Sequence, residues 1–322
     1  MTALLGSSLV LATPAPAPGA AKAATLPVPA RLTPTQPVPS KPAPAPADNT
    51  HGTQTPDTAA THPMPRLAGV VQAPLVGPVT LYAPPSNVPV RGLALFLSGD
   101  GGWNLGVLGM ARDAADLGFW VAGFSTPRYL HALDAQPVGT CIDAAGTLAK
   151  LATNLKQELD LPANLPPVLI GYSSGATTVY AALVQAAPGT FGGGVSLGFG
   201  PDIEATHAFC PGAGGLTEQK SPRPPHLPSM LPNTHLSASW QILQGEIDED
   251  VAPRFATEYV AGVPTAKAWL LPHVGHGFGV PRNWAPQYRA ALQSLLPASV
   301  KPAPVASTRL SAARPAAHSR NL

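Results

Sequence analysis

The chain has 322 residues, 41 of them proline, and a formal net charge of +2. Residues 1–66 hold 14 of the prolines and no regular apolar pattern, so they cannot bury a hydrophobic core. Residues 67–298 have 11 Lys and Arg against 15 Asp and Glu, a formal charge of −4. This segment has no basic surplus, which argues against nucleic acid as a partner.

Both ends of the chain differ in composition from the centre. Residues 3–12 form an apolar run too short to span a membrane, followed by a small-x-small cleavage site at 21–23, although no basic residue precedes the run. We predict a signal peptide at 1–24; an Ala-rich start without that role is the alternative. A Pro/Ala-rich disordered linker is expected at 25–66. A disordered basic tail is expected at 299–322, with solvated rather than membrane-bound charges.

In residues 67–298, apolar runs typical of buried parallel strands alternate with segments typical of helices. Strands are predicted at 79–83, 93–97, 119–124, 167–170, 194–198, 240–244 and 266–271. Helices are predicted at 104–117, 140–159, 176–187, 252–260 and 284–296. This order predicts an α/β fold with a doubly wound, mostly parallel sheet, in which active sites lie at the carboxyl ends of strands.

Residues 199–237 interrupt the alternation with prolines, glycines and histidines. Long connections inside a compact domain are typical of lids, so we predict a cap over the strand ends. The two cysteines, Cys141 and Cys210, have no metal-ligand spacing. In an exported protein they are expected to form a disulfide that tethers this cap, whereas in the cytosol they would be free thiols.

The most informative motif is the G-x-S-x-G pattern at 171–175, which follows a predicted strand and precedes a predicted helix. Such a strand-to-helix turn lifts the serine hydroxyl above the sheet, where it can act as a nucleophile. We therefore predict Ser173 as the nucleophile.

An acid and a base follow in the order that this architecture requires. Asp248, three residues after Gly245 at the end of a predicted strand, is expected to be the acid, with Asp250 as the alternative. His276 lies between two glycines after the last predicted strand and is expected to be the base. His273 is interpreted as a supporting or cap-contacting residue. A zinc site at the two histidines lacks a third ligand, so we predict no metal.

The glycine-rich loop at 98–103 follows the strand at 93–97 and is expected to supply part of the oxyanion hole. The N–H groups of Asp100 and Ser174 are the predicted donors, and Asp100, Trp103 and Tyr172 are predicted to bind substrate. An outward Asp100 carboxylate would favour a cationic acyl group. The alternative is that Asp100 caps the following helix.

Three segments carry a resemblance to a known family. These are Leu97-Ser98-Gly99-Asp100-Gly101-Gly102-Trp103, Gly171-Tyr172-Ser173-Ser174-Gly175-Ala176, and Leu271-Pro272 with Gly275-His276. Residues 67–298 resemble the bacterial virulence protein VirJ / AcvB family through these motifs. The resemblance implies a periplasmic α/β-hydrolase that cleaves aminoacyl esters of phosphatidylglycerol, notably the lysyl ester, and a link to secretion and virulence. Ser174 and Thr177 depart from the bulky Phe and the Asp usual in the family.

The motifs together predict a serine hydrolase that cleaves an ester bond and needs no cofactor. The expected partner is a small-molecule or lipid ester. No transmembrane span is predicted, so a lipid ester would be bound at the membrane surface. Two alternatives remain: a generic carboxylesterase or lipase, and a non-catalytic exported binding or secretion-assembly factor.

Overall fold

The computed structural model describes residues 66–296. The predicted signal peptide at 1–24, the linker apart from its last residue Arg66, and the tail at 299–322 lie outside the described residues. Within the described part, no helix has the length and apolar character needed to cross a membrane.

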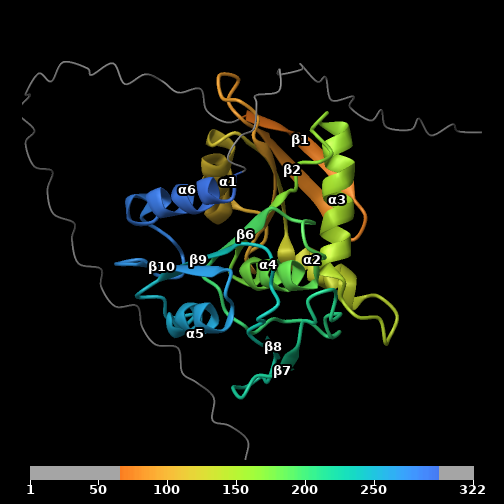
Figure 1. The fold of residues 1–322 in the computed structure, drawn as a ribbon, viewed down its shortest axis with the longest axis vertical. Coiled ribbons are helices and arrows are strands. Elements are labelled where there is room, and N and C mark those ends of the chain that lie inside the picture. Colours follow the sequence, from red (N-terminus) through yellow and green to blue (C-terminus); the bar gives the residue numbers. More distant parts are fainter. Residues whose placement is uncertain (1–65, 297–322) are drawn as a thin grey trace, which may run out of the picture. The chain divides into compact units, whose positions relative to one another are not determined.

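One eight-stranded sheet organises the described residues (Figure 1). Its strands are β1 (Arg66–Ala73), β2 (Gly77–Ala83), β3 (Gly92–Leu97), β4 (Phe119–Phe124), β5 (Val168–Tyr172), β6 (Gly193–Leu197), β9 (Trp240–Gly245) and β10 (Ala266–Leu271). They lie in the order β1-β2-β4-β3-β5-β6-β9-β10. Only the pairings of β2 with β1 and with β4 are antiparallel, which confirms the predicted mostly parallel sheet.

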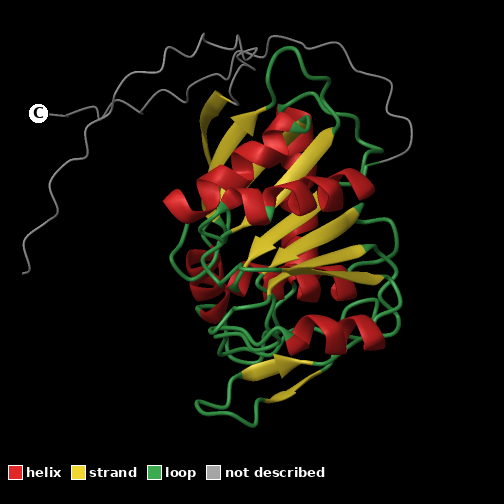
Figure 2. Cartoon of the chain, turned by 90° about the vertical axis from the view of Figure 1, so that its left-hand side faces the viewer, coloured by secondary structure: helices red, strands yellow, loops and turns green. Residues whose placement is uncertain are grey.

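Helices cover both faces of this sheet (Figure 2). They are α1 (Leu105–Asp116), α2 (Thr126–Asp134), α3 (Ala144–Glu158), α4 (Ser174–Gln185), α5 (Arg254–Gly262) and α6 (Ala285–Ser294), with a 3-10 turn η1 (Pro281–Asn283). Helices α1 and α6 bury their apolar sides on one face, and α2 to α5 on the other. Along β3, Leu95 contributes to one core and Phe96 to the other, and both are fully buried. Burial on both faces explains why the strand sequence is continuously apolar.

The structure differs from the sequence expectation at several places. The helix expected at 140–159 begins only at Ala144, because the Asp143 side chain accepts the N–H of Gly146 and caps it there. Helix α2 and the edge strand β1 were not predicted. The expected cap at 199–237 contains the short antiparallel pair β7 (Glu218–Lys220) and β8 (Pro228–Met230), which form a separate small sheet.

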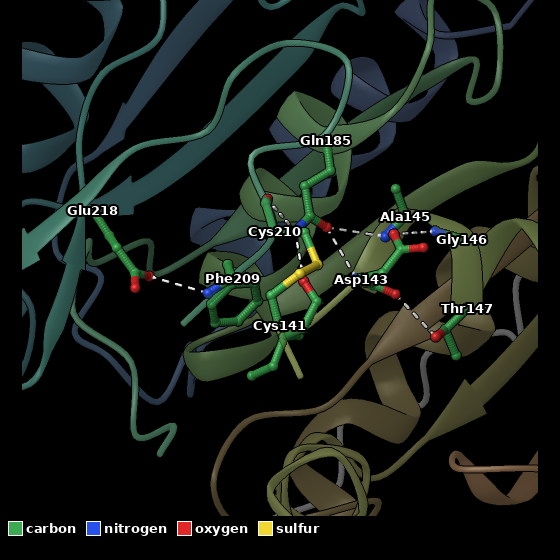
Figure 3. The surroundings of a disulfide bond; sticks show 11 residues. Cys141, Asp143, Ala145, Gly146, Thr147, Gln185, Phe209, Cys210 and Glu218 are labelled. Carbon is green, nitrogen blue, oxygen red and sulfur yellow. Dashed lines mark hydrogen bonds between the residues drawn. A yellow bond between two sulfur atoms is a disulfide. The ribbon is translucent and has the colours of Figure 1, made fainter. Parts of the chain in front are cut away.

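The predicted disulfide between Cys141 and Cys210 is confirmed, with the two Cα atoms 4.9 Å apart (Figure 3). The buried Gln185 side chain, at the end of α4, lies beside it and uses its whole hydrogen-bonding capacity. Its amide donates to the carbonyls of Ile142 (2.7 Å) and Cys210 (2.8 Å). Its oxygen accepts the N–H groups of Ala144 (3.0 Å) and Ala145 (3.1 Å). One side chain thus joins the start of α3 and the 199–237 segment to the end of α4.

The disulfide closes a loop across a sequence separation of 69 residues. Because a cross-link of this span restricts the unfolded chain, replacing both cysteines by serine should lower the free energy of unfolding by about 2–4 kcal/mol. Urea unfolding followed by circular dichroism would measure the change. The unsubstituted protein in reducing buffer is the matched control and should shift by the same amount. An unchanged urea midpoint in both samples would contradict the expectation.

Candidate active site

Ser173 occupies a sharp turn between β5 and α4. Its backbone angles, φ 55° and ψ −121°, lie in a region that residues with a side chain rarely adopt. The turn depends on two glycines with no space for a side chain. A Cβ atom at Gly171 would overlap the carbonyl oxygen of Gly175, and a Cβ atom at Gly175 would overlap that of Leu97. The G-x-S-x-G pattern is therefore a steric requirement of this turn.

Three of the predicted residues form a continuous hydrogen-bonded chain. His276 Nε2 lies 3.0 Å from Ser173 Oγ, and His276 Nδ1 lies 2.9 Å from Asp248 Oδ2. The Asp248 side chain is fully buried, and the His276 side chain is 16% exposed. An ionised carboxylate can only accept, so Nδ1 carries the proton and Nε2 is left to accept the Ser173 proton.

The Asp248 carboxylate accepts hydrogen bonds from other groups besides His276. Its Oδ1 accepts the backbone N–H groups of Asp250 (3.1 Å) and Val251 (2.8 Å). Its Oδ2 also accepts from the side-chain amide of Gln244 at 2.8 Å. Gln244 is fully buried on β9. Its contact with Asp248 was not predicted from the sequence, although a glutamine in an apolar strand, four residues before the predicted acid, was a signal for it. The alternative acid, Asp250, is exposed and makes no hydrogen bond to His276.

A hydrogen bond from the last residue of β5 positions the loop that contains His276. The hydroxyl of Tyr172 donates to the carbonyl of His276 at 3.0 Å, and the two ring centroids are 5.5 Å apart. Burial raises the pKa of Tyr172, with smaller contributions from the nearby carboxylates of Asp248, Asp250 and Asp100, so the phenol remains a donor at neutral pH. His273 is exposed and does not line the cavity at Ser173.

One group of His, Cys, Asp and Glu side chains in the described part has the spacing of a metal site. It consists of Asp248, Asp250 and His276, whose ligand atoms lie within 4.8 Å of one another. It does not include His273, so it is not the pair considered in the sequence. Because His276 and Asp248 already hydrogen-bond to each other, we interpret the group as part of the proton-transfer chain.

The glycine-rich loop after β3 is anchored to the start of α2. The Thr126 hydroxyl donates to the Ser98 carbonyl at 2.6 Å, and the Ser98 hydroxyl accepts the Thr126 N–H at 3.1 Å. Asp100 does not cap α1, because Asn104 takes that role by accepting the N–H of Gly106 at 3.1 Å. Asp100 is exposed and lines the cavity, as does Ser174 in the first turn of α4.

Trp103, the last residue of the glycine-rich loop, is partly buried. Its indole packs on Gly123, where a Cβ atom would overlap the ring, and meets the Phe96 ring edge-on at a centroid distance of 5.4 Å. It does not line the cavity at Ser173. The role of Trp103 in substrate binding stays a prediction, because in the structure this partly buried ring packs against the core beside the glycine-rich loop.

Ser173 and His276 open into a cavity of about 420 Å³. The 199–237 segment supplies one wall and is joined to α4 by the Thr177 hydroxyl, which donates to the Gly200 carbonyl at 2.6 Å. Among the described residues, four carboxylates line the cavity, but only one Lys or Arg does. The carboxylates are those of Asp100, Asp202, Glu204 and Asp250, and the cation is Arg223.

No family model matches the chain, and no curated protein matches it. Several solved structures are similar to it. Est1E from Butyrivibrio proteoclasticus is 12% identical, with 71% of this chain and 99% of that chain covered and a TM-score of 0.48. XC6422 from Xanthomonas campestris, a serine hydrolase without a lid, is 18% identical, with 74% and 97% covered and a TM-score of 0.44. A soluble variant of monoglyceride lipase from Saccharomyces cerevisiae is 10% identical, with 76% and 98% covered and a TM-score of 0.48.

The chain has the α/β-hydrolase fold. Its sheet order and the strand-to-helix turn at Ser173 establish the architecture, and the predicted acid Asp248 and the predicted base His276 come after β9 and β10. The assignment of roles to Ser173, His276 and Asp248 rests on the geometry of this chain.

The hydrogen bond from Gln244 to Asp248 can be tested by substitution. Its Oε1 atom is buried without a hydrogen-bond partner, so the amide is placed for its donor alone. Hydrogen bonds to a charged group contribute about 1.5–3 kcal/mol, so Gln244→Met should lower kcat/KM on an aryl ester by about 10- to 100-fold. Gln241→Met, a nearly buried position on the same strand, is the matched control. Equal losses in both variants would attribute the effect to the strand rather than to Asp248.

Proposed function

We propose that this protein is a serine hydrolase that cleaves carboxylic esters. The observation that carries the proposal is the hydrogen-bonded chain from Ser173 through His276 to Asp248, at 3.0 and 2.9 Å. A strained serine, a histidine poised to take its proton and a buried carboxylate behind the histidine form the arrangement needed for nucleophilic acyl transfer.

The reaction follows from these positions. His276 Nε2 takes the hydroxyl proton as Ser173 Oγ attacks the ester carbonyl, and Asp248 stabilises the imidazolium that forms. The N–H groups of Ser174 and Asp100 are the proposed donors to the oxyanion, each contributing about 3 kcal/mol. His276 returns the proton to the leaving alcohol, and a water molecule then hydrolyses the acyl-enzyme by the same steps.

For the substrate, we propose an ester with a cationic acyl group. Asp100, Glu204 and Asp250 line the cavity, and within the described residues none of them has an ion-pair partner. Their field attracts an ammonium group and disfavours an anionic acyl chain. An aminoacyl ester of phosphatidylglycerol, notably the lysyl ester, has this character, and the family resemblance and the predicted export signal support a periplasmic location. A generic carboxylesterase is the second candidate.

Labelling with a fluorophosphonate probe tests the nucleophile. The purified protein should be labelled at one equivalent, Ser173→Ala should not be labelled, and His276→Ala should be labelled far more slowly. Ester hydrolysis by Ser173→Ala should fall by at least about 10⁴-fold, because the triad acts as a unit.

Ser294→Ala, on α6, is the matched control and should be labelled normally. Well-folded protein that takes up no label would favour the non-catalytic binding factor over the hydrolase.

The role of the Asp100 charge is tested with Asp100→Asn, which keeps the backbone N–H and removes the carboxylate. We expect kcat/KM to fall about threefold to fivefold for a lysyl ester and to stay within about twofold for an uncharged ester of the same alcohol, because an exposed charge pair contributes up to about 1 kcal/mol. Measuring both esters side by side decides the point, and equal losses on the two would remove Asp100 from substrate selection.

A further inference from the structure

A second cavity, of about 280 Å³, lies next to the one at Ser173. The two cavities share four lining residues, namely Pro201, Asp202, Arg223 and Phe255. Three of the four have polar or aromatic side chains, and the shared set forms the partition between the cavities. A ligand that passes this partition would therefore contact both.

Arg223 holds an unusual position in this partition. Within residues 66–296 it is the one Lys or Arg that lines the cavity at Ser173, and it also lines the second cavity. Its guanidinium lies over the Phe255 ring, 5.3 Å from the centroid, and its Nη2 atom is 3.1 Å from Asp202 Oδ2. Stacking on the aromatic ring orients the planar group.

The ion pair between Arg223 and Asp202 is open to exchange. The two side chains are 54% and 22% exposed, so their pairing contributes little to stability. A guanidinium has five N–H donors, and among the described residues one side-chain hydrogen bond of Arg223 is formed. Asp202 keeps the Ser221 hydroxyl as a second partner at 2.9 Å when Arg223 turns to another acceptor. An anionic ligand oxygen can thus replace the carboxylate at low cost.

We propose that Arg223 and the second cavity form a subsite for an anionic oxygen group, phosphate or carboxylate, on the alcohol part of the ester. The inference rests on the proposed function. A cationic acyl part is attracted to the carboxylates of the first cavity and repelled by Arg223, so the guanidinium faces the other part of the substrate. The site then selects esters that are cationic on the acyl side and anionic on the alcohol side.

Three lysyl esters test the subsite: those of glycerol, glycerol phosphate and glyceric acid. The full-length protein should prefer an anionic alcohol, and the better of the two anionic esters identifies the group. Arg223→Gln should lower kcat/KM on that ester about tenfold, mainly through KM, because a charge-assisted hydrogen bond is lost. On the glycerol ester the same variant should change kcat/KM by less than about twofold.

The variant Asp202→Asn distinguishes ligand binding by Arg223 from a purely structural role of the Arg223–Asp202 ion pair in the cavity wall. If Asp202 competes with the ligand for Arg223, this variant keeps or improves activity on the anionic ester. If the ion pair only supports the wall, Asp202→Asn and Arg223→Gln lose activity alike, on all three esters, and the proposal is overturned. Arg289→Gln is the matched control, because Arg289 forms a similar half-exposed pair with Asp113 at 3.0 Å between α6 and α1.

A binding measurement keeps this test independent of catalysis. Titration calorimetry of the Ser173→Ala variant should detect glycerol phosphate or glycerate but not glycerol, and adding Arg223→Gln should abolish that binding. Absence of fluorophosphonate labelling would refute the hydrolase while leaving this result to stand. Equal binding with and without Arg223 would refute the subsite while leaving the hydrolase intact.

Discussion

The backbone turn at Ser173 is the constraint on which the site depends. A positive φ at a serine is unfavourable by itself, and it persists because β5 enters and α4 leaves a packed sheet with no space for side chains at Gly171 and Gly175. The first turn of α4 therefore starts at the cavity, so the positive end of the helix dipole lies at the cavity too. One steric arrangement thus positions both the proposed nucleophile and the proposed oxyanion donor.

Helix α4 connects the turn at Ser173 to the 199–237 segment. Thr177 in its first turn hydrogen-bonds the Gly200 carbonyl, and Gln185 at its end binds backbone on both sides of the disulfide. Both ends of α4 are thus attached to the 199–237 segment, and the Cys141–Cys210 bond adds a covalent restraint. A wall built in this way keeps a defined cavity although it contains little regular secondary structure.

Charge is distributed unevenly around that cavity. The carboxylates of Asp100, Glu204 and Asp250 line the cavity at Ser173, whereas Arg223 lines both this cavity and the second one. Inside the fold, Asp248 is compensated by Gln244, His276 and two backbone N–H groups, so a fully buried carboxylate is tolerated. In the proposed function, the buried charge supports the chemistry and the exposed charges select the substrate.

The sequence by itself determined the order of strands and helices in the α/β core apart from β1 and α2. It also pointed to Ser173, Asp248 and His276, because each lies in a local pattern: a turn that needs glycines, or a loop directly after an apolar strand. Only the tertiary structure decided that Asp248 rather than Asp250 meets His276, that Gln244 hydrogen-bonds Asp248, that Trp103 packs against the core, and that Asn104 caps α1. Only the structure, too, placed Arg223 beside the cavity. The physical reason is that local patterns encode dihedral angles and burial, whereas these contacts join side chains from loops and strands far apart in the chain.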